Sequence, residues 1–160
     1  MASNSISTSQ SLQTAKVLNA TNGKERTSVS SFITLAGRIL FSAIFILSGF
    51  LHFSQADIGY AAQAGVPMAN LLVPASGILA LVGGLSILLG YKANIGAWLL
   101  VLFLVPVTLM MHNFWAVKDP MMAQMQMAMF LKNVTIVGGA LLISQFGAVP
   151  LSLDARKSER

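Results

Sequence analysis

The chain has 160 residues, of which 55% are hydrophobic and only 9% are charged, and its mean hydropathy is +0.72. A soluble domain carries about 25% charged residues, so this composition excludes an ordinary soluble globule and indicates a single-domain membrane protein. The chain contains no cysteine, which excludes disulfides, thiolate metal sites and iron–sulfur ligation, so that any redox chemistry needs a bound cofactor or a partner.

The first 31 residues are polar and rich in Ser, Thr and Asn, with Lys16, Lys24 and Arg26 among them. We expect residues 1–31 to form a disordered cytoplasmic tail, with a transit peptide as the alternative.

The net charge of +5 is of the sign found in proteins that bind nucleic acid. The basic residues gather in the tails and one loop without interleaved aromatic residues, so no nucleic-acid partner is expected.

Four apolar segments follow, each about as long as the roughly 20 residues needed to cross a bilayer core about 30 Å thick. They are Phe32–Phe53, Pro67–Gly90, Ile95–Trp115 and Met125–Gly147. The short connections predict an all-α fold, an antiparallel bundle of four transmembrane helices over residues 32–147. Residues 148–160 then form a basic cytoplasmic tail, and the lipid bilayer is the first expected partner.

Positive charge is divided unevenly between the two ends of this predicted bundle. Both tails and the loop with Lys92 share one end, whereas Asp57, Lys118 and Asp119 lie at the other. Positive residues mark the cytoplasmic side of a membrane protein. We therefore predict that both termini are cytoplasmic and that the chain is integral to a bacterial inner membrane.

Small and polar residues recur at helical spacing in each segment and predict the inward faces of the helices. The positions are Arg38, Ser42, Phe45, Gly49 and His52 in the first segment, Gly77, Ala80 and Gly84 in the second, Val105, Thr108, His112 and Trp115 in the third, and Ala128, Lys132, Thr135 and Gly139 in the fourth. A lysine within hydrocarbon costs about 2.5–3.5 kcal/mol on insertion scales. Lys132 is therefore expected to face the bundle rather than the lipid.

The candidate site lies in the outer half of the bundle. A rise of about 1.5 Å per residue places His52, His112 and Lys132 there, with Asn113 and Asn133 near the same level. We predict a polar pocket, open to the outside, that binds a quinone or a polar headgroup. In the alternative interpretation Lys132 reaches back to the interface and the histidines lie among the headgroups.

Two other chemistries are weaker alternatives for these residues. His52 and His112 come from different segments and are a possible pair of axial haem ligands. The run DPMMAQMQMAMF contains five methionines, and thioethers suit Cu(I), although methionine more often fills apolar gaps. We assign no metal site from either pattern.

Four stretches resemble, in their order and spacing, the DoxX family of small four-helix integral membrane proteins. They are GRILFSAIFILSGFLHF, AGVP, LVGGLSILLGYKANIGAWLL and FLKNVTIVGGALLI, and the resemblance covers about residues 32–147. Many members of that family carry an acidic residue just before the glycine pair of the second helix, where this chain has Ala80. An ion-pair or proton-relay role built on that acid therefore does not carry over.

The resemblance implies a redox-linked membrane subunit or anchor associated with quinone or quinol. It would act with a protein partner or as a homo-oligomer, and any enzymatic role would be that of an oxidoreductase subunit. No covalently bound cofactor is expected, and quinone is the candidate bound molecule. The alternative is a non-catalytic scaffold or accessory subunit of a larger membrane complex, in which the small residues only pack the bundle.

Overall fold

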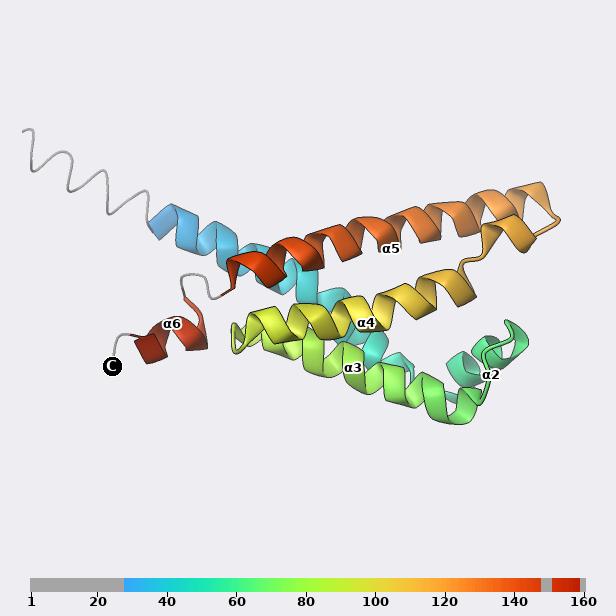
Figure 1. Cartoon of the computed structure of the whole chain (residues 1–160), viewed down its shortest axis with the longest axis horizontal. Coiled ribbons are helices and arrows are strands. Elements are labelled where there is room, and N and C mark those ends of the chain that lie inside the picture. The colour runs from blue at the N-terminus through green and yellow to red at the C-terminus, as the bar shows by residue number, and fades with distance from the viewer. Residues whose placement is uncertain (1–27, 148–150, 159–160) are drawn as a thin grey trace, which may run out of the picture.

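The computed structural model of the chain describes residues 28–147 and 151–158. Over these residues the fold is all-α, and four long apolar helices pack antiparallel, which confirms the predicted bundle (Figure 1). They are the first helix, Ser28–Leu51, followed by α3 (Ala69–Leu89), α4 (Ala93–Met111) and α5 (Pro120–Phe146). Each is long and apolar enough to cross a membrane.

Three shorter helices join or follow these spans and were not predicted. They are α2 (Gln55–Gln63), the 3₁₀ turn η1 (Phe114–Ala116) and α6 (Leu153–Ser158). The predicted tail over residues 1–31 lies outside the described residues up to position 27, and helix is already present at Ser28. Within the predicted tail over residues 148–160, the described part contains α6.

The turn between α3 and α4 is set by Gly90. Its φ of 63° lies in the left-handed region, which glycine adopts without the strain that a Cβ would bring. The Gly90 N–H donates to the Ile87 carbonyl at 3.1 Å and the Tyr91 N–H donates to the Ser86 carbonyl at 3.0 Å, which is the Schellman arrangement that ends a helix. The chain therefore reverses within a few residues, and α4 returns alongside α3.

Helix α3 approaches its two neighbours closely because glycines lie at both contacts. A Cβ placed on Gly77 would lie 2.9 Å from the carbonyl oxygen of Gly49 in the first helix. On another side of α3, a Cβ placed on Gly83 would lie 2.9 Å from the carbonyl oxygen of Gly96 in α4. Such backbone proximity is how helices associate in lipid, where there is no hydrophobic drive between them.

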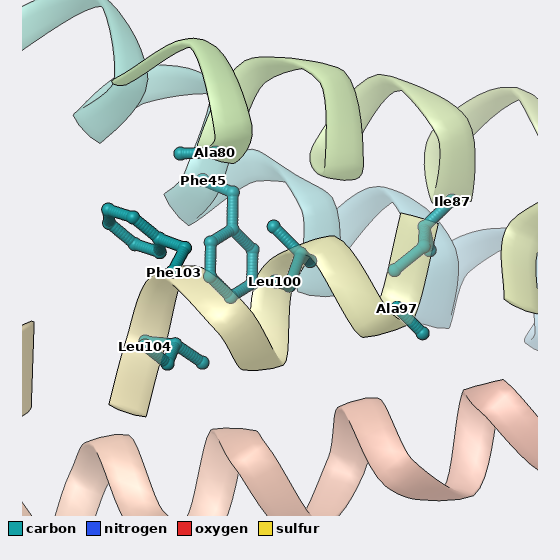
Figure 2. Close-up of a cluster of buried hydrophobic side chains, with 7 residues drawn as sticks. All are labelled: Phe45, Ala80, Ile87, Ala97, Leu100, Phe103 and Leu104. Atoms are coloured by element: carbon teal, nitrogen blue, oxygen red, sulfur yellow. The ribbon is translucent and has the colours of Figure 1, made fainter. Parts of the chain in front are cut away.

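The main hydrophobic core lies between the first helix, α3 and α4, and Figure 2 shows its side chains together. Its buried members are Phe45, Ala80, Ile87, Ala97, Leu100, Phe103 and Leu104. The predicted inward positions of the first two spans are confirmed, because Arg38, Ser42, Phe45 and Gly49 are buried and so are Gly77, Ala80 and Gly84. In the third predicted span the prediction is right for Thr108 of α4 and wrong for Val105 of α4 and Trp115 of η1, which are exposed.

Arg38 ties three chain segments together at the end of the bundle that carries the α3–α4 turn. Its side chain is 8% exposed. Nε donates to the Ile87 carbonyl at 2.9 Å, Nη2 donates to the Leu88 carbonyl, and Nη1 donates to the Leu151 carbonyl at 3.2 Å. The last carbonyls of a helix lack intrahelical partners and carry partial negative charge. The guanidinium therefore stabilises the end of α3 and fixes the chain that leads into α6.

Asp154 makes the reciprocal contact at the start of α4. Its Oδ2 accepts from the backbone N–H of Lys92 at 2.7 Å, and its own N–H donates to the Gly90 carbonyl at 3.1 Å. A carboxylate at a helix N-terminus satisfies a free N–H and complements the helix dipole. The start of α6 is thus held against the α3–α4 turn, as its position in Figure 1 shows.

We expect Gly83→Ala to lower the free energy of unfolding by about 1–3 kcal/mol, because the added methyl overpacks a close backbone contact. Gly138→Ala in α5 is the matched control, since a Cβ there meets nothing within 4 Å and alanine favours helix by up to about 1 kcal/mol. Apparent melting temperatures in a mild detergent measure both. Equal melting temperatures for the two variants would contradict the proposed close packing of α3 on α4.

Candidate functional site

A cavity of about 590 Å³ lies between α2, α3 and α4 at the end of the bundle opposite the α3–α4 turn. Ligand pockets typically measure about 300–1,000 Å³, so the cavity is large enough for a small molecule. Its wall is mainly apolar and includes Leu72, Val73 and Leu79 of α3 with Leu102, Val107 and Met111 of α4. The polar residues at the wall are few, namely His52, Asp57, Tyr60, Ser76 and His112.

His52 lies just beyond the end of the first helix and has a defined ring orientation. Its Nδ1 is 2.6 Å from the carbonyl oxygen of Ser48. Because a carbonyl only accepts hydrogen bonds, Nδ1 carries the proton, and in the neutral ring the lone pair is on Nε2. The ring also meets Phe103 edge to face, with centroids 5.5 Å apart, which helps to hold it in place.

His112 ends α4 and connects it to α5. Its Nδ1 is 2.8 Å from Oε1 of Gln126, an amide oxygen that accepts, so this ring too keeps its lone pair on Nε2. Asn113 follows it, is half-buried and is absent from the cavity wall. The structure therefore places His52 and His112 at one cavity and leaves Asn113 outside it.

Next to His112, three aromatic rings gather at the same end of the bundle. Phe114 lies 5.1 Å from Trp115 and 5.5 Å from Phe130, measured between ring centroids, and Trp115 lies 5.9 Å from Phe130. All three pairs are edge to face, the arrangement that aromatic rings favour. The group joins η1 to α5.

Asp57 and Tyr60 were not predicted as site residues, because the connection after the first helix was not predicted to be helical. Ser54 begins α2, and its Oγ accepts from the Asp57 N–H at 3.1 Å. The sequence Ser-Gln-Ala-Asp at positions 54–57 contains the hydroxyl and the carboxylate, three residues apart, that typify a helix N-terminus. That signal was sufficient to find α2. Helix α2 then packs on the start of α3 through Ile58, Ala61, Ala69 and Val73.

Lys132 does not face the bundle, and this prediction was wrong. Lys132 is exposed on α5 and does not line the cavity, whereas its neighbour Asn133 is only 5% exposed. The buried face of α5 runs through Asn133, Ala140 and Ser144, one position away from the predicted stripe. Neither Lys132 nor Asn133 lines the cavity. Across residues 28–147 and 151–158, no group of three or more His, Cys, Asp or Glu is placed to hold a metal ion.

Comparison with known proteins identifies relatives of this chain. The model of the SURF4 family matches residues 1–159. The inner membrane protein YphA of Escherichia coli strain K12 is 29% identical over 126 residues, which are 78% of this chain and 89% of that protein. The ER-derived vesicles protein ERV29 of Saccharomyces cerevisiae is 29% identical over 80 residues, which are 50% of this chain and 26% of that protein. No solved structure matches the chain.

These matches overturn the expected family and the function drawn from it. The membership inferred from resemblance to the DoxX family is wrong, because the family model that matches nearly the whole chain is that of SURF4. The redox-linked, quinone-associated subunit and its alternative, the accessory subunit of a larger complex, are corrected with it, because the family and the relatives found are the SURF4 family, YphA and ERV29. The motifs that suggested the DoxX family reflect four membrane spans with glycine contacts between them. Membrane bundles outside that family also have this pattern.

We expect Lys132→Met to make insertion of α5 more favourable by up to about 2.5–3.5 kcal/mol, because it removes a charge from hydrocarbon. The apparent free energy of insertion into microsomes of a segment over residues 117–147, which contains Lys118 and all of α5, measures this. Lys118→Met is the matched control, since Lys118 is exposed before α5 begins, and its insertion energy is expected to stay unchanged. Equal values for Lys132→Met and the unchanged chain would show that Lys132 already reaches the interface.

Proposed function

The chain belongs to the SURF4 family, and we propose that it is an integral membrane protein that binds a small amphiphile in the cavity between α2, α3 and α4. The observation that carries the proposal is the cavity itself. It combines an apolar wall with a few polar groups, which is the usual composition of a site for a small organic molecule.

The two parts of the wall suit the two parts of an amphiphile. A hydrocarbon portion packs against side chains such as Leu72, Val107 and Met111, and a polar portion lies near His52, Asp57 and His112. Transfer of the hydrocarbon portion from the bilayer to this wall gains little hydrophobic free energy, because lipid tails are themselves apolar. Specific binding therefore depends on the shape of the cavity and on hydrogen bonds to its polar groups.

We also propose that both termini face the cytoplasm and that the cavity lies in the outer half of an inner membrane. The relative YphA is named an inner membrane protein. Lys92 lies at the end of the bundle where the first helix begins at Ser28 and where α6 meets the α3–α4 turn, and positive residues mark the cytoplasmic side. The cavity is at the other end, near Asp57 and His112.

We expect Leu72→Trp to weaken binding of a long-chain amphiphile by about tenfold or more, because the indole fills part of the cavity. Leu71→Trp is the matched control, since Leu71 is also an exposed residue of α3 and does not line the cavity. Native mass spectrometry of the detergent-solubilised protein counts bound molecules at each concentration. If both variants bind as the unchanged protein does, the cavity is not the binding site.

A reporter fused after Arg160 is expected to be fluorescent as green fluorescent protein and inactive as alkaline phosphatase, because the C-terminus lies in the cytoplasm. The same reporters inserted at Lys118 are expected to give the opposite pair of results. Helix α6, which precedes Arg160, and Lys118 lie at opposite ends of the bundle, so each insertion serves as the control of the other. An active phosphatase at Arg160 would reverse the proposed orientation.

A further inference from the structure

The polar groups of the cavity are almost all hydrogen-bond acceptors. Nδ1 of His52 lies 2.6 Å from the Ser48 carbonyl and Nδ1 of His112 lies 2.8 Å from Oε1 of Gln126, and because both oxygens accept, we place the proton of each neutral ring on Nδ1. Each ring therefore offers the lone pair of Nε2 to anything else. No hydrogen bond to either Nε2 is present among the described residues.

Ser76 and Asp57 also present hydrogen-bond acceptors to the cavity. The Ser76 hydroxyl donates its proton to the Val73 carbonyl at 2.7 Å, which leaves its oxygen as an acceptor. The Asp57 carboxylate is an acceptor only. Among the described residues of the cavity wall, Tyr60 alone has a side-chain hydroxyl whose proton is not already donated.

The charge of the wall is also one-sided. Asp57 carries a negative charge, and the described wall contains neither Lys nor Arg. Arg38 is bound to backbone carbonyls at the far end of the bundle, and Lys132 lies on the outside of α5. A carboxylate in an apolar surrounding attracts a cation more strongly than it does in water, because the effective dielectric constant is lower.

We propose that the cavity selects amphiphiles with an ammonium headgroup, that is, long-chain primary amines. This inference rests on the proposed function and names the class of ligand. An ammonium group has three donors and no acceptor, so it matches the acceptors on His52, His112 and Asp57 and neutralises the carboxylate. A carboxylate or phosphate headgroup would meet only acceptors and a like charge. An alcohol would satisfy one acceptor and leave the charge of Asp57 unpaired.

The test compares three probes of equal chain length, namely tetradecylamine, tetradecanol and tetradecanoate. Native mass spectrometry of the full chain in a non-ionic detergent gives the dissociation constant of each. We expect the amine to bind at least about tenfold tighter than the alcohol or the acid, because charge-assisted hydrogen bonds are roughly twice as strong as neutral ones. Equal affinities for the amine and the acid would overturn the proposal.

Variants of Asp57 assign the preference to the cavity. Asp57→Asn is expected to bring the amine to the affinity of the alcohol, and Asp57→Glu, which keeps the charge, is expected to retain the preference. Asp119→Asn is the matched control at the same end of the molecule, because it also removes one negative charge but does not line the cavity. A preference that survives Asp57→Asn, or that disappears with Asp119→Asn, would overturn the assignment.

The outcome separates this inference from the proposed function. If all three probes bind equally and Leu72→Trp weakens all of them, the cavity binds amphiphiles and only the selection of ammonium is wrong. If none of the probes binds, the proposed function fails together with the inference. If Asp57→Asn melts far below the unchanged protein, Leu72→Trp decides the question, because it must remove the tighter binding of the amine while Leu71→Trp leaves that binding unchanged.

Discussion

The arrangement of the bundle depends on the close approach of the α3 backbone to two neighbours at once. Gly77 meets Gly49 of the first helix, and Gly83 meets Gly96 of α4, with the facing backbone carbonyls nearer than a Cβ on Gly77 or Gly83 would allow. In lipid no hydrophobic force brings helices together, so dispersion contacts at such short range supply the association energy. The first helix and α4 are placed by α3, and the core around Phe45 and Leu100 fills the space between them.

The same constraint explains why the cavity lies where it does. The glycine contacts lie between Gly77 and the α3–α4 turn, and Figure 1 shows α3 and α4 separating toward α2. Beyond Gly77 the helices present larger side chains such as Leu72 and Val73, while Pro106 interrupts the hydrogen bonds of α4. Helix α2 closes the widened end from the side. Tight packing at one end and a cavity at the other thus follow from one distribution of small residues.

Much of this architecture could be predicted from the sequence, because hydrophobic length and small-residue spacing are local signals. The inward face from Arg38 to Gly49 could be predicted because most of its residues are polar or small, whereas the residues beside them are mainly large and apolar. Asn133 and Lys132 were not separable in this way, because both are polar and adjacent, and a shift of one residue turns a helix face by about 100°. Asp57 was missed because a short helix after a long span lacks periodicity, although Ser54 marked its start. The family was misjudged because loose motifs of glycine and spacing are shared by unrelated bundles.

The acceptors of the Arg38 hydrogen bonds are synthesised at different times, so the bonds become available in a fixed order. Its partners Ile87 and Leu88 lie about fifty residues further along the chain, and Leu151 lies 113 residues further along. A chain made at about 5–20 residues per second inserts the first helix well before the Leu151 carbonyl exists. The guanidinium therefore has no acceptor at Leu151 until that residue has been synthesised, so this contact becomes available after those with Ile87 and Leu88. The contact with Leu151 is thus absent from every partly synthesised chain that stops before residue 151.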